Sequence, residues 1–270
     1  GRLLSSAQAF LEGCKKNKTC YNSDIAHHDY NGVFMKGMRA FTLAEVLITL
    51  GIIGVVASMT IPSLIANHNE KQTVVQLKKV YATLSNAYVS VLNEYGAPAD
   101  WGLPSKNNNE SHDMFMAKFD NYLKYIKNCG TTDNSCYTDK IYDLKGNPYT
   151  SDVITVNSFK AILADGSGFA LRVWNENCVL DYDICAFFEV DVNGLKKPNR
   201  FGRDIFRFYV TPKTIIPYGS PVWPGNDDQN FDNKCLIGGG ACTAWVLINE
   251  NMDYLHCPEK LGWDKAKSCK

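Results

Sequence analysis

The stretch from Met35 to Pro62 constrains this chain more than any other part of its sequence. Two basic residues, Lys36 and Arg39, precede an apolar run that carries a single carboxylate, Glu45, near its start. Residues 41–65 are 25 residues with one charge, enough for a helix across about 30 Å of hydrocarbon. An ionised side chain at the bilayer centre costs roughly 2.5–3.5 kcal/mol. We therefore expect a membrane-spanning helix in which Glu45 has a partner.

This stretch resembles the leader and first helix of type IV pilins and of the pseudopilins of type II secretion. The resemblance lies in Phe41-Thr42-Leu43-Ala44-Glu45, in the aliphatic run that follows, and in Pro62. It implies that a prepilin peptidase cuts between Ala40 and Phe41, and that the new amine of Phe41 is methylated. In that family the residue before the cut is usually glycine. Here it is Ala40, so we expect slower cleavage.

The resemblance also implies a role for Glu45 in assembly. In the family, the glutamate of an incoming subunit meets the N-terminal amine of a subunit already in the filament. Such pairing offsets part of the desolvation cost of both charges. Two alternatives are a pair with the chain's own Phe41 amine and a neutral Glu45 near the interface. The implied partners are other pilin or pseudopilin subunits, the prepilin peptidase, the inner-membrane assembly machinery and the lipid bilayer.

The chain divides into five segments on this interpretation. The basic leader keeps the N-terminus in the cytoplasm, so we expect a single-pass protein of the inner (cytoplasmic) membrane. Its C-terminal domain lies outside the cytoplasm and joins a periplasmic or surface filament. Pro62 lacks a backbone donor and is expected to kink the helix or melt it locally. The segments are 1–34, an upstream stretch of doubtful status; 35–40, the prepilin leader; 41–65, the transmembrane helix; 66–96, its amphipathic continuation; and 97–270, an extracytoplasmic disulfide-containing domain.

The exported part predicts an α+β fold. Apolar residues recur every three or four positions from Asn67 to Tyr95, as in an amphipathic helix, and Gly96 ends it. Two flanking apolar segments make Asp165-Gly166-Ser167 a hairpin signal. A long helix packed on an antiparallel sheet is expected, which is also the pilin-like fold that the resemblance implies. The sequence predicts a further helix at 113–127 and strands at 158–164, 168–174, 186–192, 205–211 and 244–248.

Eight of the ten cysteines lie in the exported part, in four neighbouring couples. An even number in an oxidising compartment indicates disulfides, and the absence of C-x-x-C leaves a zinc site poorly supported. Pairing of neighbours is our first prediction, and buried free thiols are the alternative. The Gly238–Gly240 run is expected to be a disulfide-closed turn, since no Lys-Ser/Thr follows it as in a phosphate loop. The eight are Cys129, Cys136, Cys178, Cys185, Cys235, Cys242, Cys257 and Cys269.

One polar segment could hold a cation. Asp191, Asn193 and Asp204 place oxygen-bearing side chains around Gly194 and Gly202, and such oxygens suit a hard cation such as Ca²⁺. The segment resembles one found in pilin-like proteins. It lacks full EF-hand spacing. The alternative is a plain polar turn in which Asp and Asn bond their own backbone.

The composition excludes some functions and leaves others open. The net charge is zero, so nothing points to a nucleic-acid partner. We find no catalytic motif and expect a structural subunit of a type II secretion pseudopilus or type IV pilus, not an enzyme. One alternative is a minor tip pilin or adhesin, with a ligand surface including Tyr218, Trp223 and Tyr254. Another is an extracytoplasmic enzyme on a signal anchor.

Overall fold

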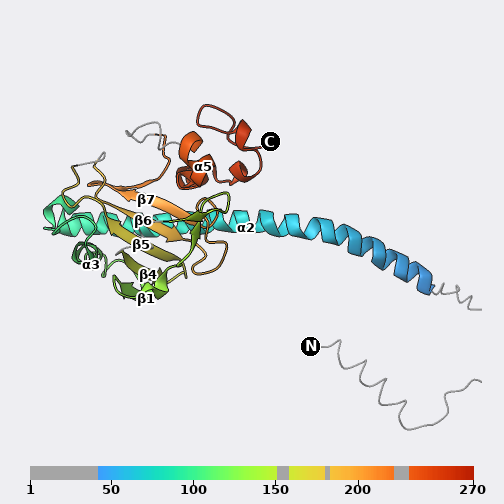
Figure 1. The fold of residues 1–270 in the computed structure, drawn as a ribbon, viewed down its shortest axis with the longest axis horizontal. Coiled ribbons are helices and arrows are strands. Elements are labelled where there is room, and N and C mark those ends of the chain that lie inside the picture. Colours follow the sequence, from blue (N-terminus) through green and yellow to red (C-terminus); the bar gives the residue numbers. More distant parts are fainter. Residues whose placement is uncertain (1–41, 151–157, 180–182, 222–230) are drawn as a thin grey trace, which may run out of the picture. The chain divides into compact units, whose positions relative to one another are not determined.

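The computed structural model describes residues 42–150, 158–179, 183–221 and 231–270 (Figure 1). The chain forms two compact units, Gly1–Gly54 and Val55–Lys270. Of the first, only the start of one long helix, from residue 42 onward, is described. The leader, Ala40, Phe41 and the upstream segment 1–34 lie outside the described residues.

The long helix α2 spans Leu43–Tyr95 and is 53 residues long. It continues through Pro62, so the helix is not interrupted at the proline. Its end follows the prediction. Gly96 has a φ of +74°, a conformation that glycine adopts without a Cβ penalty. The Gly96 amide donates to the Leu92 carbonyl at 3.0 Å, which closes the last turn.

Burial divides α2 into two parts. Before Val74 no residue of the helix is buried, and large apolar side chains such as Ile52 and Leu64 are about 60% exposed. From Val74 onward, one stripe of the helix enters the core. Among the described residues, α2 is the one helix long and apolar enough to cross a membrane, by length and composition. The buried stripe is Val74, Leu77, Val80, Leu84, Ala87, Tyr88 and Val91.

The C-terminal half of α2 packs on an antiparallel sheet (Figure 1). The predicted α+β fold, a long N-terminal helix with an antiparallel sheet, is confirmed. The strand order is β1-β4-β5-β6-β7-β8, so after β4 each strand pairs with the next along the chain. The strands are β1 (Tyr125–Gly130), β4 (Phe159–Leu163), β5 (Gly168–Val173), β6 (Ala186–Asp191), β7 (Ile205–Val210) and β8 (Ile215–Pro217); a separate pair is formed by β2 (Ile141–Tyr142) and β3 (Pro148–Tyr149).

The two faces of the sheet differ in chemistry. On the helix side, Tyr81 stacks on Phe208 of β7 with ring centroids 5.5 Å apart, and the buried Tyr88 hydroxyl donates to the Thr211 carbonyl at 2.6 Å. On the other side, Arg207 pairs with the fully buried Glu189 and lies over the ring of Phe187. Successive side chains along a strand point to opposite faces of the sheet, and this alternation separates the two sets.

Two predicted elements are wrong. The helix expected at 113–127 is the shorter α3 (Asn109–Ala117), and the residues after it form a turn and then β1, whose pairing with β4 outweighs the helical period. The strand expected at 244–248 is the helix α6 (Cys242–Asn249). A short apolar run has no periodicity that separates a strand from a buried helix.

The C-terminal region is built of short helices closed by disulfides. The π-helix η4 (Phe231–Cys235) leads into α5 (Leu236–Gly238) and α6. Phe231 stacks on Trp245 of α6 with centroids 4.0 Å apart. Elsewhere in the described residues, the short 3₁₀ helices are η1 (Pro98–Asp100), η2 (Asn134–Cys136), η5 (Asp253–Leu255) and η6 (Pro258–Lys260).

Candidate functional site

The start of α2 holds Glu45 in a local hydrogen-bond pair with Thr42. The Thr42 amide and hydroxyl both donate to Glu45 Oε2 at 2.9 Å. In return the Glu45 amide donates to the Thr42 hydroxyl oxygen at 3.2 Å. This reciprocal arrangement is a capping box, which satisfies amides at a helix N-terminus. Sequence reasoning missed it, although Thr-x-x-Glu before an apolar run is its signature.

The eight cysteines from Cys129 onward form four disulfides. The bridges are Cys129–Cys136, Cys178–Cys185, Cys235–Cys242 and Cys257–Cys269. The prediction that neighbours pair is confirmed. Cys235–Cys242 encloses the Gly238–Gly240 run, as the disulfide-closed turn requires.

The β6–β7 loop, residues 192–204, carries the predicted cation ligands. Asp191 ends β6 and pairs with Ile205 at the start of β7, and the Val192 amide donates to the Asp204 carbonyl at 2.9 Å. The loop is therefore closed at its base, which brings Asp191 and Asp204 together. Gly194 has a φ of +73°, and a Cβ there would lie 2.6 Å from the Gly166 carbonyl oxygen of the β4–β5 turn.

Asp204 organises the loop from its base. Its Oδ2 accepts from the Asn199 amide at 2.8 Å and from Asn193 Nδ2 at 3.1 Å. Its Oδ1 accepts from the Arg200 amide at 2.6 Å. The structure thus brings together Asn193 and Asp204, 11 residues apart in sequence, as the sequence predicted.

Three oxygens in this loop and at the end of β6 are buried and have no hydrogen-bond donor within the described part of the chain. They are Asp191 Oδ2, Asn193 Oδ1 and Asn199 Oδ1. Asn199 Nδ2 donates to the Thr138 hydroxyl at 2.8 Å, which fixes the orientation of that amide. Buried polar atoms almost always have partners. Three such oxygens therefore require an explanation.

The pKa values of both carboxyl groups are raised above that of an ordinary aspartate. Burial, followed by repulsion from Asp204, raises the pKa of Asp191 to about 9. Burial also raises the pKa of Asp204, against four hydrogen bonds that favour the charged form. Without a cation, burial favours the protonated form of both acids, and an entering cation would favour the charged form.

The residues present fit a hard cation. Two carboxylates and two side-chain amide oxygens are the ligand types that calcium takes. Asn199 belongs to the polar segment in the sequence but was not among the predicted ligands, and its link to Thr138 spans 61 residues. Among the described residues, no group of three His, Cys, Asp or Glu side chains is placed to hold a metal, so this mixed oxygen set is the candidate.

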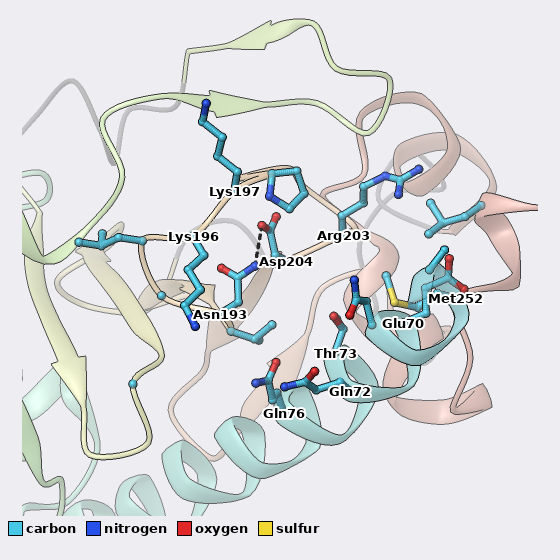
Figure 2. Close-up of a pocket in the computed structure, with 18 of the residues that line it drawn as sticks. Glu70, Gln72, Thr73, Gln76, Asn193, Lys196, Lys197, Arg203, Asp204 and Met252 are labelled. Carbon is cyan, nitrogen blue, oxygen red and sulfur yellow. Dashed lines mark hydrogen bonds between the residues drawn. The ribbon is translucent and has the colours of Figure 1, made fainter. Parts of the chain in front are cut away.

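A polar cavity of about 790 Å³ lies between this loop and α2. Its floor is a polar stretch of the helix that includes Gln72, Thr73 and Gln76, and Asn193 and Asp204 face it from the loop (Figure 2). At one end, the Glu70 carboxylate accepts from His256 Nε2 across 2.9 Å. This contact ties the C-terminal region to the helix.

Two of the three aromatic residues considered from the sequence for a ligand surface lie in the core. Tyr218 and Tyr254 are 8% and 2% exposed, and the Tyr254 hydroxyl donates to the Gly202 carbonyl at 2.6 Å. Both tyrosines therefore belong to the interior. Trp223 lies outside the described residues.

Comparison with known proteins identifies a family. The chain matches a family of unknown function, DUF6613, over residues 63–222. No curated protein and no solved structure matches the chain. The matched region is more than half of the 270 residues and includes the sheet and the β6–β7 loop. The chain therefore belongs to the DUF6613 family.

Proposed function

We propose that this chain is a membrane-anchored, pilin-like structural subunit that polymerises through its N-terminal helix into a type II secretion pseudopilus or a type IV pilus. Its role is mechanical, without catalysis. The family match supplies no function, so the proposal depends on the anchor helix and on the sequence resemblance around Glu45.

The observation that carries the proposal is the division of α2 by burial. The apolar residues up to Ile65 are exposed, whereas the stripe from Val74 onward is in the core. Exposing so much apolar surface to water is unfavourable, and large exposed apolar surfaces mark membrane or protein interfaces. A bilayer before assembly and neighbouring helices after it would cover this surface.

The four disulfides support export of the folded domain. Disulfides persist in oxidising compartments outside the cytoplasm, and the positive leader before α2 favours a cytoplasmic N-terminus. In the proposed cycle, the domain folds outside the inner membrane while residues 41–65 remain in the bilayer. The helix then leaves the lipid for the filament.

Processing tests the proposal directly. In membrane-extracted protein, mass spectrometry is expected to find Phe41 as the methylated N-terminus, with the leader removed. A mature chain that begins beyond Ile65 would show removal of an ordinary signal peptide. That result would overturn the proposal.

A second proposed function is cation binding by the β6–β7 loop. Asp191, Asn193, Asn199 and Asp204 would supply the oxygens, and calcium is the class of ion that suits them. The three buried oxygens without donors favour this over a plain turn. The bound ion would neutralise the two acids and brace the loop against the β4–β5 turn. Calorimetric titration of the full chain in detergent is expected to show calcium binding, and no heat at millimolar calcium would contradict it.

A further inference from the structure

The cavity beside α2 adjoins the apolar part of the helix directly. Ala66 lines the cavity, and the residue before it, Ile65, is the last of the apolar run and is 54% exposed. Each helical residue rises about 1.5 Å, and the headgroup layer extends roughly 5–8 Å beyond the hydrocarbon. If residues up to Ile65 lie in hydrocarbon, the end of the cavity at Ala66–Glu70 lies at the level of the headgroups.

The lining of the cavity has unpaired positive charge. Lys196 and Lys197 are exposed and Arg203 is half-buried, and none of the three has an acid within ion-pair distance among the described residues. Arg203 Nε is buried without an acceptor there. In Figure 2, Lys196 extends from the loop towards α2, and Lys197 points away from it. The cations therefore lie both inside the cavity and at its outer side.

The acidic side chains that line the cavity already have hydrogen-bond or ion-pair partners. Glu70 contacts His256 at 2.9 Å, and Asp165 pairs with Lys79 at 3.6 Å. Asp204 accepts the backbone amides of its own loop. An anion that enters the cavity would thus meet Lys196 and Arg203, with Lys197 at the outer side, and no uncommitted carboxylate among these three acids.

The remaining lining suits a hydroxylated headgroup. Asn69, Gln72, Thr73 and Gln76 line the helix side and offer both donors and acceptors. Exposed apolar side chains, including Leu64 at 64%, continue along the same helix. The groups of a phospholipid follow the same order along its length: apolar chains, then an anionic phosphate, then a polar end group.

We propose that this cavity binds the anionic headgroup of a phospholipid, such as phosphatidylglycerol, whose acyl chains lie along the apolar part of α2. Lys196 and Arg203 bind the phosphate, and Lys197, at the outer side of the cavity, lies against the anionic membrane surface. The side-chain amides of α2 bind the headgroup hydroxyls. The bound lipid holds the domain against the membrane. The proposal rests on the membrane anchoring proposed above and is independent of filament assembly.

The test is hydrogen exchange of the full chain in nanodiscs. Discs of phosphatidylcholine alone are compared with discs that contain phosphatidylglycerol. Amides of residues 66–76 and 193–203 are expected to exchange several-fold more slowly with the anionic lipid. Each cation near an anionic surface contributes about five-fold in affinity, so the triple variant Lys196→Gln, Lys197→Gln, Arg203→Gln should weaken binding roughly 100-fold and lose the protection.

A matched triple variant controls for net charge. Lys124 and Lys213 are exposed and Lys118 is half-buried. Two of the three lie near the far end of α2: Lys118 is over the Tyr95 ring, and Lys213 is within the Thr211–Thr214 turn that Tyr88 contacts. Changing these three lysines to glutamine should leave the protection at the wild-type level. Equal loss in both variants would overturn the proposal.

Further arms separate the possible failures. A chain that does not enter the discs would overturn both the anchoring and this proposal. If the chain enters the discs but phosphatidylglycerol does not change its hydrogen exchange, this proposal alone is overturned. Inorganic phosphate is added to the phosphatidylcholine discs in a third arm, and slowing by phosphate alone would identify a soluble anion as the ligand instead of a lipid.

Discussion

Thr42 and Glu45 satisfy each other at the start of α2, with the Glu45 carboxylate accepting from both the Thr42 amide and hydroxyl at 2.9 Å. Glu45 therefore has a partner within its own chain before any second subunit arrives. Three intrachain hydrogen bonds involve this pair. An intersubunit contact with the Phe41 amine would add to these bonds or replace them, and mutations at the two positions can separate the roles.

The first prediction concerns assembly. Glu45→Ala should leave the exported domain folded and the chain in the membrane, because removing an acid lowers the insertion cost. Filament incorporation should fail, since the amine of the neighbouring subunit loses its partner. Glu45→Gln should be milder, because an amide still accepts a hydrogen bond. Sheared filaments are assayed for the variant.

Thr42→Ala is the control for this prediction. It removes the capping hydroxyl, at a cost of about 0.5–2 kcal/mol in helix stability, and keeps the acid. Filaments should contain this variant. If Thr42→Ala is excluded as fully as Glu45→Ala, the acid acts by capping the helix, and the intersubunit role is wrong.

The second prediction concerns the disulfides. Closing a loop of about eight residues stabilises the folded state by roughly 2–3 kcal/mol through the entropy of the unfolded chain. The double variant Cys178→Ser, Cys185→Ser should lower the free energy of unfolding by about that amount. Non-reducing peptide mapping of protein from its native compartment should recover all four bridges. Free thiols at these positions would contradict the prediction.

The third prediction is a pH dependence without calcium. Between the ordinary aspartate pKa of about 4 and the folded pKa of Asp191 of about 9, the folded state holds a proton that the unfolded state has lost. Stability should therefore fall as the pH rises through this window. In chelator, the melting temperature of the wild type should fall more steeply from about pH 5 to about pH 8 than that of Asp191→Asn.

Calcium should reverse this trend. Because the ion competes with protons for the carboxylates, millimolar calcium should raise the wild-type melting temperature more at pH 8 than at pH 5. Asp191→Asn should lose most of this response. Asp139→Asn, at an exposed aspartate, serves as the control and should behave as the wild type. An equal rise in melting temperature with calcium in all three proteins would show that the loop is a plain turn that binds no calcium.

The fourth prediction tests the division of α2. Leu84 is fully buried and Leu64 is 64% exposed. Leu84→Ala should lower the free energy of unfolding by about 2–5 kcal/mol, because it leaves a cavity in the core. Leu64→Ala makes the same chemical change on the same helix and should leave that free energy within about 0.5 kcal/mol of the wild type. Denaturant titration in detergent measures both, and equal losses would show that the apolar part is packed in the domain.

The elements that were predicted correctly depend on short-range signals. The period of apolar residues located the buried part of α2, and Gly96 marked its end. The Asp165-Gly166-Ser167 turn located the β4–β5 hairpin. The four disulfides join cysteines 7 or 12 residues apart, where a short loop keeps neighbours close. By contrast, β1 and α6 were mispredicted, since their conformations depend on strand pairing and packing partners far along the chain.

The sequence alone determined the apolar helix with its acid, the amphipathic continuation and the clustering of oxygen-bearing residues between Asp191 and Asp204. Each depends on residues close enough in the chain for spacing to reveal them. Only the tertiary structure decided that the Asn199 side-chain amide is held by a hydrogen bond to Thr138. It alone also placed Lys196 beside α2, across the same cavity as Gln76. Contacts between distant segments follow from the register of the sheet and the packing of the core, which no local pattern specifies.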